Sequence, residues 1–193
     1  METPNEGGGG ARRRNWDAYA AMVATLIGLL ALLVSAYTAH LQRQQLRAQV
    51  WPYLSIATAN VAPDIGFHVT NSGTGPARVI AARIRVDHHL VTTWGAVHKA
   101  VGGRADSNFI YADLTHAVMS PGKDLTILRP LNAESAPSFV ELYLGTQHEL
   151  GLEVCYCSVL DECWLTASDD DARVTAIGGP DDCPIPAGER FKQ

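Results

Sequence analysis

The 193 residues suffice for one domain of ordinary size with an appendage. Hydrophobic residues make up 47% of the chain, and much of this content lies in one block near the N-terminus. The formal net charge of -5 excludes nucleic acid as a partner on electrostatic grounds, because domains that bind nucleic acid are normally basic.

The chain begins with a polar, glycine-rich segment, "METPNEGGGG", followed by three arginines. Segments of this composition bury too little apolar surface to offset the entropy of ordering. We therefore expect residues 1–15 to form a disordered arm.

An apolar helix is predicted over residues 16–39. No charged residue occurs between Ala18 and Ala39, and about 22 helical residues reach about 33 Å, enough to cross a hydrocarbon core of about 30 Å. Trp16 at one end and Tyr37 at the other suit the two water–lipid interfaces. We therefore expect a transmembrane helix that anchors the chain in a lipid bilayer.

Two other interpretations of this segment compete with an anchor. A buried core helix rarely runs this long without a polar face. A cleavable secretory signal is the second alternative, with Arg12, Arg13 and Arg14 as its basic region and Val34-Ser35-Ala36 as the cleavage site. The apolar run is longer than the roughly 7–15 residues of a typical signal, which favours an uncleaved anchor.

The arginines on either side of the span indicate its orientation. Arg12, Arg13 and Arg14 precede it, and Arg43 and Arg47 follow it. Because basic residues are retained on the cytoplasmic side, the excess of one arginine favours a cytoplasmic N-terminus. The C-terminal domain then lies outside the cytoplasm.

A helical stalk is expected over residues 40–51. The stretch "HLQRQQLRAQV" is rich in Gln, Arg and Leu and contains no Gly or Pro, so the helix should continue beyond the bilayer. Trp51-Pro52 should end it, because proline disfavours helical geometry in the residue before it.

The remainder is predicted to be mainly β, as an antiparallel β-sandwich over residues 52–177 or, alternatively, a small barrel. Short runs with partial period-2 alternation, such as "IGFHVTN" and "LGLEVCYCSV", are separated by turn sequences such as "SPGKD". Residues 94–120 show the weakest pattern, and "GGRADSN" within them reads as a long loop. The Pro- and Gly-containing tail, residues 178–193, should be extended or loose.

The Gly-rich stretch "NSGTGPARVI" raises the question of a phosphate-binding loop. Such a loop requires a Lys-Ser/Thr pair after its glycines and a helix whose N-terminus faces the anion, and both are missing. We instead expect a structural turn, in which Asn71 closes one strand, Gly73 and Gly75 adopt positive φ, and Pro76 leads into the next strand.

A resemblance can be stated from these motifs. The order of a lone N-terminal span, a Gln/Arg-rich stalk, "WPYL", "FHVTNSGTGPARV" and "YCSVLDECW" resembles a group of uncharacterised bacterial single-pass membrane proteins. The "F-x-V-x-N-x-G-x-G-P-A" pattern is also similar to a strand–turn–strand element of extracytoplasmic immunoglobulin-like domains. The resemblance implies the fold, and it implies a location in a bacterial inner membrane with the C-terminal domain in the periplasm. It implies no activity.

Four cysteines invite three explanations. An even number in a domain outside the cytoplasm favours disulfides, with Cys157 facing Cys163 across a hairpin and Cys183 reaching Cys155. A two-residue turn in that hairpin would exclude the first pair. Inert thiols are the second explanation and fit a cytoplasmic domain. Zinc is the third, and the C-x-C and C-x₅-C spacings match it poorly.

The seven histidines suggest no metal motif, and we expect no cofactor. His88 and His89 are adjacent, so on a strand they point to opposite faces. An enzyme, such as a hydrolase with a His/Asp site, would need a pocket lined by at least two of His88, His89, Arg104 and Asp106.

The architecture predicts a membrane-anchored β-domain without catalytic function that binds another protein or supports an envelope assembly. The alternative is a membrane-anchored hydrolase. Thus the expected partners are the lipid bilayer and a second protein.

Overall fold

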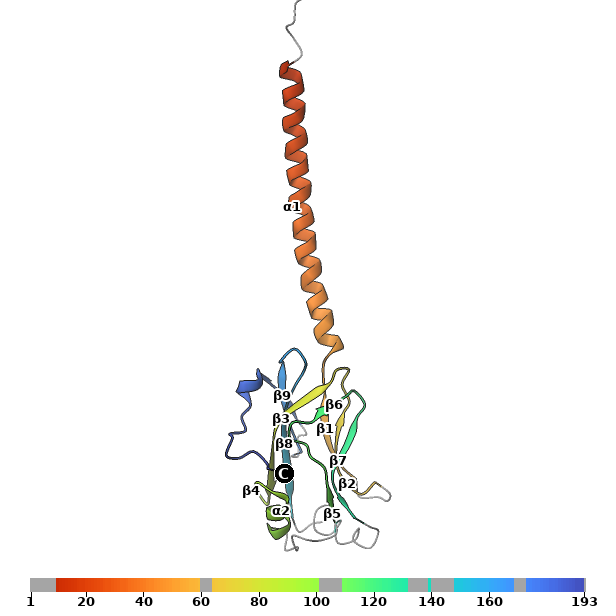
Figure 1. The fold of residues 1–193 in the computed structure, drawn as a ribbon, viewed down its shortest axis with the longest axis vertical. Helices are drawn as coiled ribbons and strands as arrows, with labels where there is room; N and C mark the ends of the chain where they lie inside the picture. The colour runs from red at the N-terminus through yellow and green to blue at the C-terminus, as the bar shows by residue number, and fades with distance from the viewer. Residues whose placement is uncertain are drawn as a thin grey trace, which may run out of the picture. The chain divides into compact units, whose positions relative to one another are not determined.

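The computed structural model describes residues 10–59, 64–100, 109–131, 139, 148–168 and 173–192. The chain divides between Leu46 and Arg47 into two compact units, a helical unit and a β-domain. Figure 1 shows the helix α1 and the strands that follow it. The predicted fold class, a mainly β chain with antiparallel sheets after an apolar N-terminal helix, is confirmed.

Helix α1 (Gly10–Gln49) contains the apolar block. Its portion from Trp16 to Gln49 includes a window of mean hydropathy 2.2 and is long and apolar enough to cross a membrane. None of that window is buried within the described structure, in contrast to what a core helix would show. The hydroxyls of Thr25 and Ser35 donate to carbonyls four residues earlier, both at 2.8 Å, so these polar groups are satisfied within the helix.

The start of α1 differs from the predicted disordered arm over residues 1–15. The helix begins at Gly10, because the Ala and Arg residues ahead of Trp16 favour helix and extend it upstream. The rest of the arm lies outside the described residues. The helix then continues through the expected stalk without interruption and ends at Gln49, ahead of the Trp51-Pro52 dipeptide.

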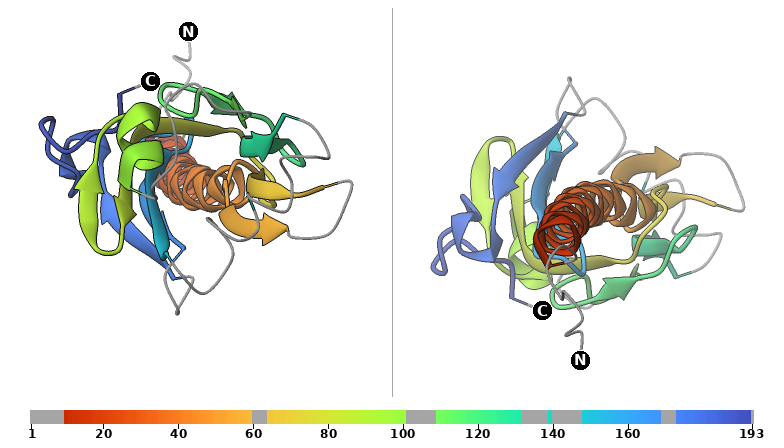
Figure 2. Two further views of the ribbon diagram at one scale, coloured as in Figure 1. Left: turned by 90° about the horizontal axis from the view of Figure 1, so that it is seen from below. Right: turned by 90° about the horizontal axis from the view of Figure 1, so that it is seen from above.

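The strands of the β-domain form two sheets, in which every pairing among the described residues is antiparallel. The first sheet has the order β1 (Leu54–Ala59), β2 (Gly66–Asn71), β7 (Asp124–Pro130), β5 (Phe109–Tyr111). The second has the order β10 (Val174–Gly178), β9 (Cys163–Ala167), β8 (Leu150–Cys157), β3 (Ala77–Val86), β4 (His89–Val91), and β6 (Val118–Met119) also pairs with β3. Figure 2 shows the two sheets on opposite sides of the domain.

Strand β3 shows how the sequence pattern translates into burial. Ile84 and Val86 face the core from even-numbered positions, whereas Val79 faces the core from an odd-numbered position. The register against β8 shifts between Val79 and Ala81, which leaves Ile80 as an extra residue. The side chains before Ile80 that face the core therefore have odd numbers, and those after it have even numbers. A β-bulge therefore explains why a strict period-2 count fails in the first half of this strand.

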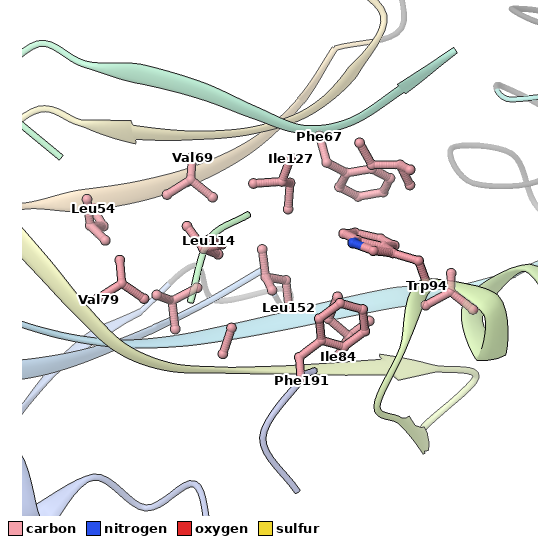
Figure 3. Close-up of a cluster of buried hydrophobic side chains, with 14 of the residues drawn as sticks. Leu54, Phe67, Val69, Val79, Ile84, Trp94, Leu114, Ile127, Leu152 and Phe191 are labelled. Atoms are coloured by element: carbon pink, nitrogen blue, oxygen red, sulfur yellow. The ribbon is translucent and has the colours of Figure 1, made fainter. Parts of the chain in front are cut away.

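The core lies between the two sheets (Figure 3). Phe67, Val69 and Ile127 of the first sheet face Ile84 and Leu152 of the second. All five side chains are at most 2% exposed. Burying each of these side chains is worth about 1.5–3 kcal/mol, so this interface supplies the main stabilisation of the domain.

The poorly patterned region after residue 94 adds ordered elements that the sequence did not predict. They are α2 (Trp94–Ala100), β5 and β6. The buried side chains of Trp94 and Val97 join the core, which is what orders the short helix. The "GGRADSN" segment lies outside the described residues.

Candidate functional site

The Gly-rich turn joins β2 to β3, with Asn71 as the last residue of β2 and Pro76 directly before β3. The prediction that Gly73 and Gly75 adopt positive φ is wrong, since neither has φ in the left-handed region. A Cβ added to either glycine would come within 3.0 Å of backbone atoms, those of residues 51–53 for Gly73 and those of Val50 for Gly75. The glycines are required because two backbone segments approach closely, not because the turn is left-handed.

Asn71 holds this turn together through four hydrogen bonds. Its Oδ1 accepts from the amides of Tyr53 (3.2 Å) and Gly73 (3.0 Å). Its Nδ2 donates to the carbonyls of Gly75 (2.8 Å) and Met119 (2.9 Å). The side chain is fully buried, and these four bonds use its whole hydrogen-bonding capacity.

The turn is hydrogen-bonded to the segment in which α1 ends. The amides of Thr74 and Gly75 donate to the carbonyl of Trp51 at 2.9 and 3.1 Å, and the Thr74 hydroxyl donates to the carbonyl of Ala48 at 3.0 Å. With these amides bonded to backbone carbonyls and a strand following the turn, the features that bind phosphate at a helix N-terminus do not occur here. The turn instead binds the backbone of residues 48–53 to the β-domain.

The cysteines form two disulfides, Cys155–Cys183 and Cys157–Cys163. These are the pairs that the sequence favoured. Cys157 and Cys163 are direct register partners on β8 and β9, with their Cα atoms 4.0 Å apart. This register places both side chains on one face of the sheet, which a two-residue turn would not have allowed.

The C-terminal tail, predicted from its Pro and Gly content to be extended or loose, is mostly irregular but fixed in place. It contains a short 3-10 helix at Pro180–Asp182, is tied to β8 by Cys183, and buries Ile185 and Phe191. The Phe191 amide donates to the carbonyl of Ala82 at 2.8 Å. Prolines and glycines prevent regular structure here, but the disulfide and two apolar side chains still fix the tail on the second sheet.

An ion-pair network adds to this attachment. Arg83 of β3 pairs with Glu153 of the adjacent β8 and, at 2.6 Å, with Glu189 of the tail. Arg85 also lies 3.1 Å from Glu153. Burial opposes ionisation of Glu153, but its hydrogen bond to Arg83 and the two arginine charges outweigh that effect and lower its pKa.

The histidines of the hydrolase alternative lie in a tight turn. His88 has φ of 65°, its side chain is 85% exposed, and it lies 3.5 Å from Glu149. His89 opens β4 and is also exposed. Arg104 and Asp106 lie outside the described residues. Both described histidines are exposed, as expected for side chains of a solvated turn.

A His–Asp pair that the sequence did not single out lies on the first sheet. His68 Nδ1 is 3.0 Å from Asp124 Oδ2, and His68 Nε2 is 3.2 Å from the carbonyl oxygen of Asp64. The Thr70 hydroxyl donates to the other oxygen of Asp124 at 2.6 Å. Both ring nitrogens thus face oxygen atoms within the protein, so neither is directed at a substrate, and the cluster joins β2 to β7.

The buried histidine His98 was also missed. It lies on α2, its Nε2 is hydrogen-bonded to the Tyr111 hydroxyl, and its ring stacks on Phe109 with the centroids 5.0 Å apart. Burial lowers the pKa of His98 below its ordinary value of 6.5. Within the described ranges, no three His, Cys, Asp or Glu side chains are grouped as a metal site requires.

Comparison of the chain with protein-family models, with curated proteins and with solved structures gave no match.

Proposed function

We propose that the chain is a single-pass protein of a bacterial inner membrane. Its N-terminus faces the cytoplasm, and its immunoglobulin-like β-domain is held in the periplasm. There the domain binds another protein or supports an envelope assembly.

The anchor rests on α1. Its apolar window is uncovered by any other part of the described structure, and water does not solvate such a surface favourably. A helix whose own backbone bonds are complete, and whose hydroxyls bond within it, is suited to a hydrocarbon environment.

The single observation that carries the proposal is the combination of this helix with a domain that holds two disulfides. Disulfides persist in oxidising compartments and are rare in the cytoplasm. A periplasmic position of the domain also agrees with the excess of arginines ahead of the span.

The binding role is supported by the surface of the β-domain. Among the described residues the first sheet has β1 and β5 as edge strands, and the second has β10 and β4. Edge strands are templates for a partner's strand. Leu90 and Leu131 are exposed apolar side chains of the kind that partner proteins cover.

The location is tested on the full chain in a bacterial host, by membrane fractionation and thiol labelling after denaturation. We expect the protein in the membrane fraction, no maleimide adduct without reductant, and one adduct per cysteine after reduction. Cleavage after Ala36 would shorten the protein by mass spectrometry and release it from the membrane. Recovery in the soluble fraction, or free thiols without reductant, would contradict the proposal.

The binding role is tested by site-specific photo-crosslinking in intact cells. A photoreactive residue at Leu90 or Leu131 should give discrete adducts with a second protein. Position 188, Gly188, is also exposed and serves as a control on the tail. Absence of adducts from every exposed position would argue against a protein partner.

A further inference from the structure

One end of the β-domain carries most of its exposed large apolar side chains. Among the described residues of the domain, six such side chains are exposed, and four of them lie at the end where the chain arrives from α1. We call these four the basal cluster: Trp51, Val118, Val159 and Leu160. The other two lie at the opposite end. Leu90 belongs to β4 and pairs with Arg85 near the end of β3, and Leu131 follows β7, whose last residues lie beside the start of β2.

Contacts within the domain place the hairpin part of the cluster beside the arriving chain. Val159 and Leu160 form the tip of the β8–β9 hairpin. Glu162 of that hairpin lies 3.0 Å from Nε of Arg47, which belongs to the same compact unit. The tip is therefore held beside the last turn of α1.

The remaining members of the cluster are connected to the same place. Val118 is the register partner of Arg78, and Arg78 pairs with Asp161 of the hairpin. The carbonyl of Trp51 accepts from the amide of Thr74. All four side chains thus belong to one end of the domain.

The composition of the hairpin tip is unusual for a turn. Turns between strands usually consist of Gly, Asn, Asp, Ser or Pro, which are well solvated. Here Val159 and Leu160 are 60% and 48% exposed. The neighbouring charges, Arg47 with Glu162 and Arg78 with Asp161, are paired, so they present little net charge to whatever covers the tip.

The length of the helix limits which partner lies near this end. From Ala39, the end of the uncharged stretch, to Arg47 the helix advances only about 12 Å, and the headgroup layer occupies roughly 5–8 Å of that distance. Membrane helices are tilted by about 20° on average, which brings the side toward which the helix leans closer to the lipid. Trp is also the side chain that prefers the water–lipid interface.

We propose that the basal cluster docks on the surface of the bilayer in which α1 is anchored, with the β8–β9 tip in the headgroup layer. The inference rests on the proposed anchor. Its consequence is that the domain does not rotate freely on its stalk but stands with β4 and β5 directed away from the lipid.

The test uses the full chain in phosphatidylcholine nanodiscs whose acyl chains are brominated close to the headgroup, since bromine quenches nearby tryptophan. The variant L160W is compared with L131W at the opposite end. For each variant, the emission of the unmodified protein is subtracted, which leaves the emission of the added tryptophan. We expect the added tryptophan of L160W to lose most of its emission and that of L131W to lose none. Equal quenching, or none at position 160, would overturn the docking.

Failure of the anchor is distinguishable in the same samples. Trp16 lies at the end of the predicted span, so the unmodified protein should itself be quenched, and W16F should remove that part. If quenching through Trp16 is absent, the anchor is wrong. If it is present and L160W is unquenched, only the docking is wrong. The double variant V159S/L160S should fold, since both side chains are exposed. If chemical cross-linking gives dimers of the unmodified protein and these are lost in V159S/L160S, the cluster binds a second copy and the docking on lipid is overturned.

Discussion

At the scale of single residues, Gly73 and Gly75 matter because they leave room for the chain that arrives from α1. A methyl group at position 75 would collide with the backbone of Val50, which cannot move like a flexible side chain. We expect G75A to destabilise the β-domain by about 1–3 kcal/mol, the usual cost of overpacking. Urea unfolding of the full chain in detergent, followed by tryptophan fluorescence, measures the change.

Gly95 provides the matched control. It lies in α2, and an added Cβ there meets no atom within 4 Å. Because alanine favours helix over glycine, G95A should be neutral or stabilising by up to about 1 kcal/mol. Equal destabilisation by both substitutions would mean that the close approach at residue 75 is not the reason for glycine there.

At the scale of elements, the tail depends on its covalent link to β8. The Cys155–Cys183 bond closes a sequence separation of 28, whereas Cys157–Cys163 closes one of 6. In the chain-entropy description the longer loop is worth roughly 3–4 kcal/mol and the shorter about 2 kcal/mol. We expect C155A/C183A to lower the unfolding free energy more than C157A/C163A and to make the tail cleavable by protease. The opposite order of the two variants, or a tail that stays protected in C155A/C183A, would contradict this account.

At the scale of the whole molecule, stability should decline with acidification in two stages. The pKa of buried His98 lies below 6.5 in the folded state, so the unfolded state binds the proton first and stability falls as the pH drops below 6.5. The pKa of Glu153 is also lowered, from 4.5, because its arginine contacts outweigh its burial, so a second loss begins below that pH. H98Q should abolish the first stage and leave the second, as measured by denaturant midpoints against pH. An unchanged slope below pH 6.5 in H98Q would exclude His98 as its source.

Comparison of particular elements shows why some predictions succeeded. The apolar helix α1 could be predicted from local information alone, since about 20 consecutive apolar residues form a pattern that does not depend on the rest of the fold. The strands β2 and β8 were recognisable from alternation alone. By contrast, α2 consists of seven residues with a weak intrinsic preference for helix. It forms because the side chains of Trp94 and Val97 pack in the core.

The candidate sites were less predictable than the strands. The His68–Asp124 pair is separated by 56 residues, and His98 meets Tyr111 across two different elements. No spacing rule connects such residues, because the register between β2 and β7 and the position of α2 bring them together. The histidines that the sequence emphasised, His88 and His89, drew attention only because they are adjacent.

The sequence by itself determined that an apolar helix precedes a mainly β domain, because hydrophobic periodicity is a local property that any compact fold must respect. Only the tertiary structure showed why residues 73 and 75 are glycine, where the β-bulge in β3 lies, and how the tail is attached. Each of these depends on how closely two segments distant in the chain approach one another. That distance is set by the packing of the whole domain, so it cannot be read from either segment alone.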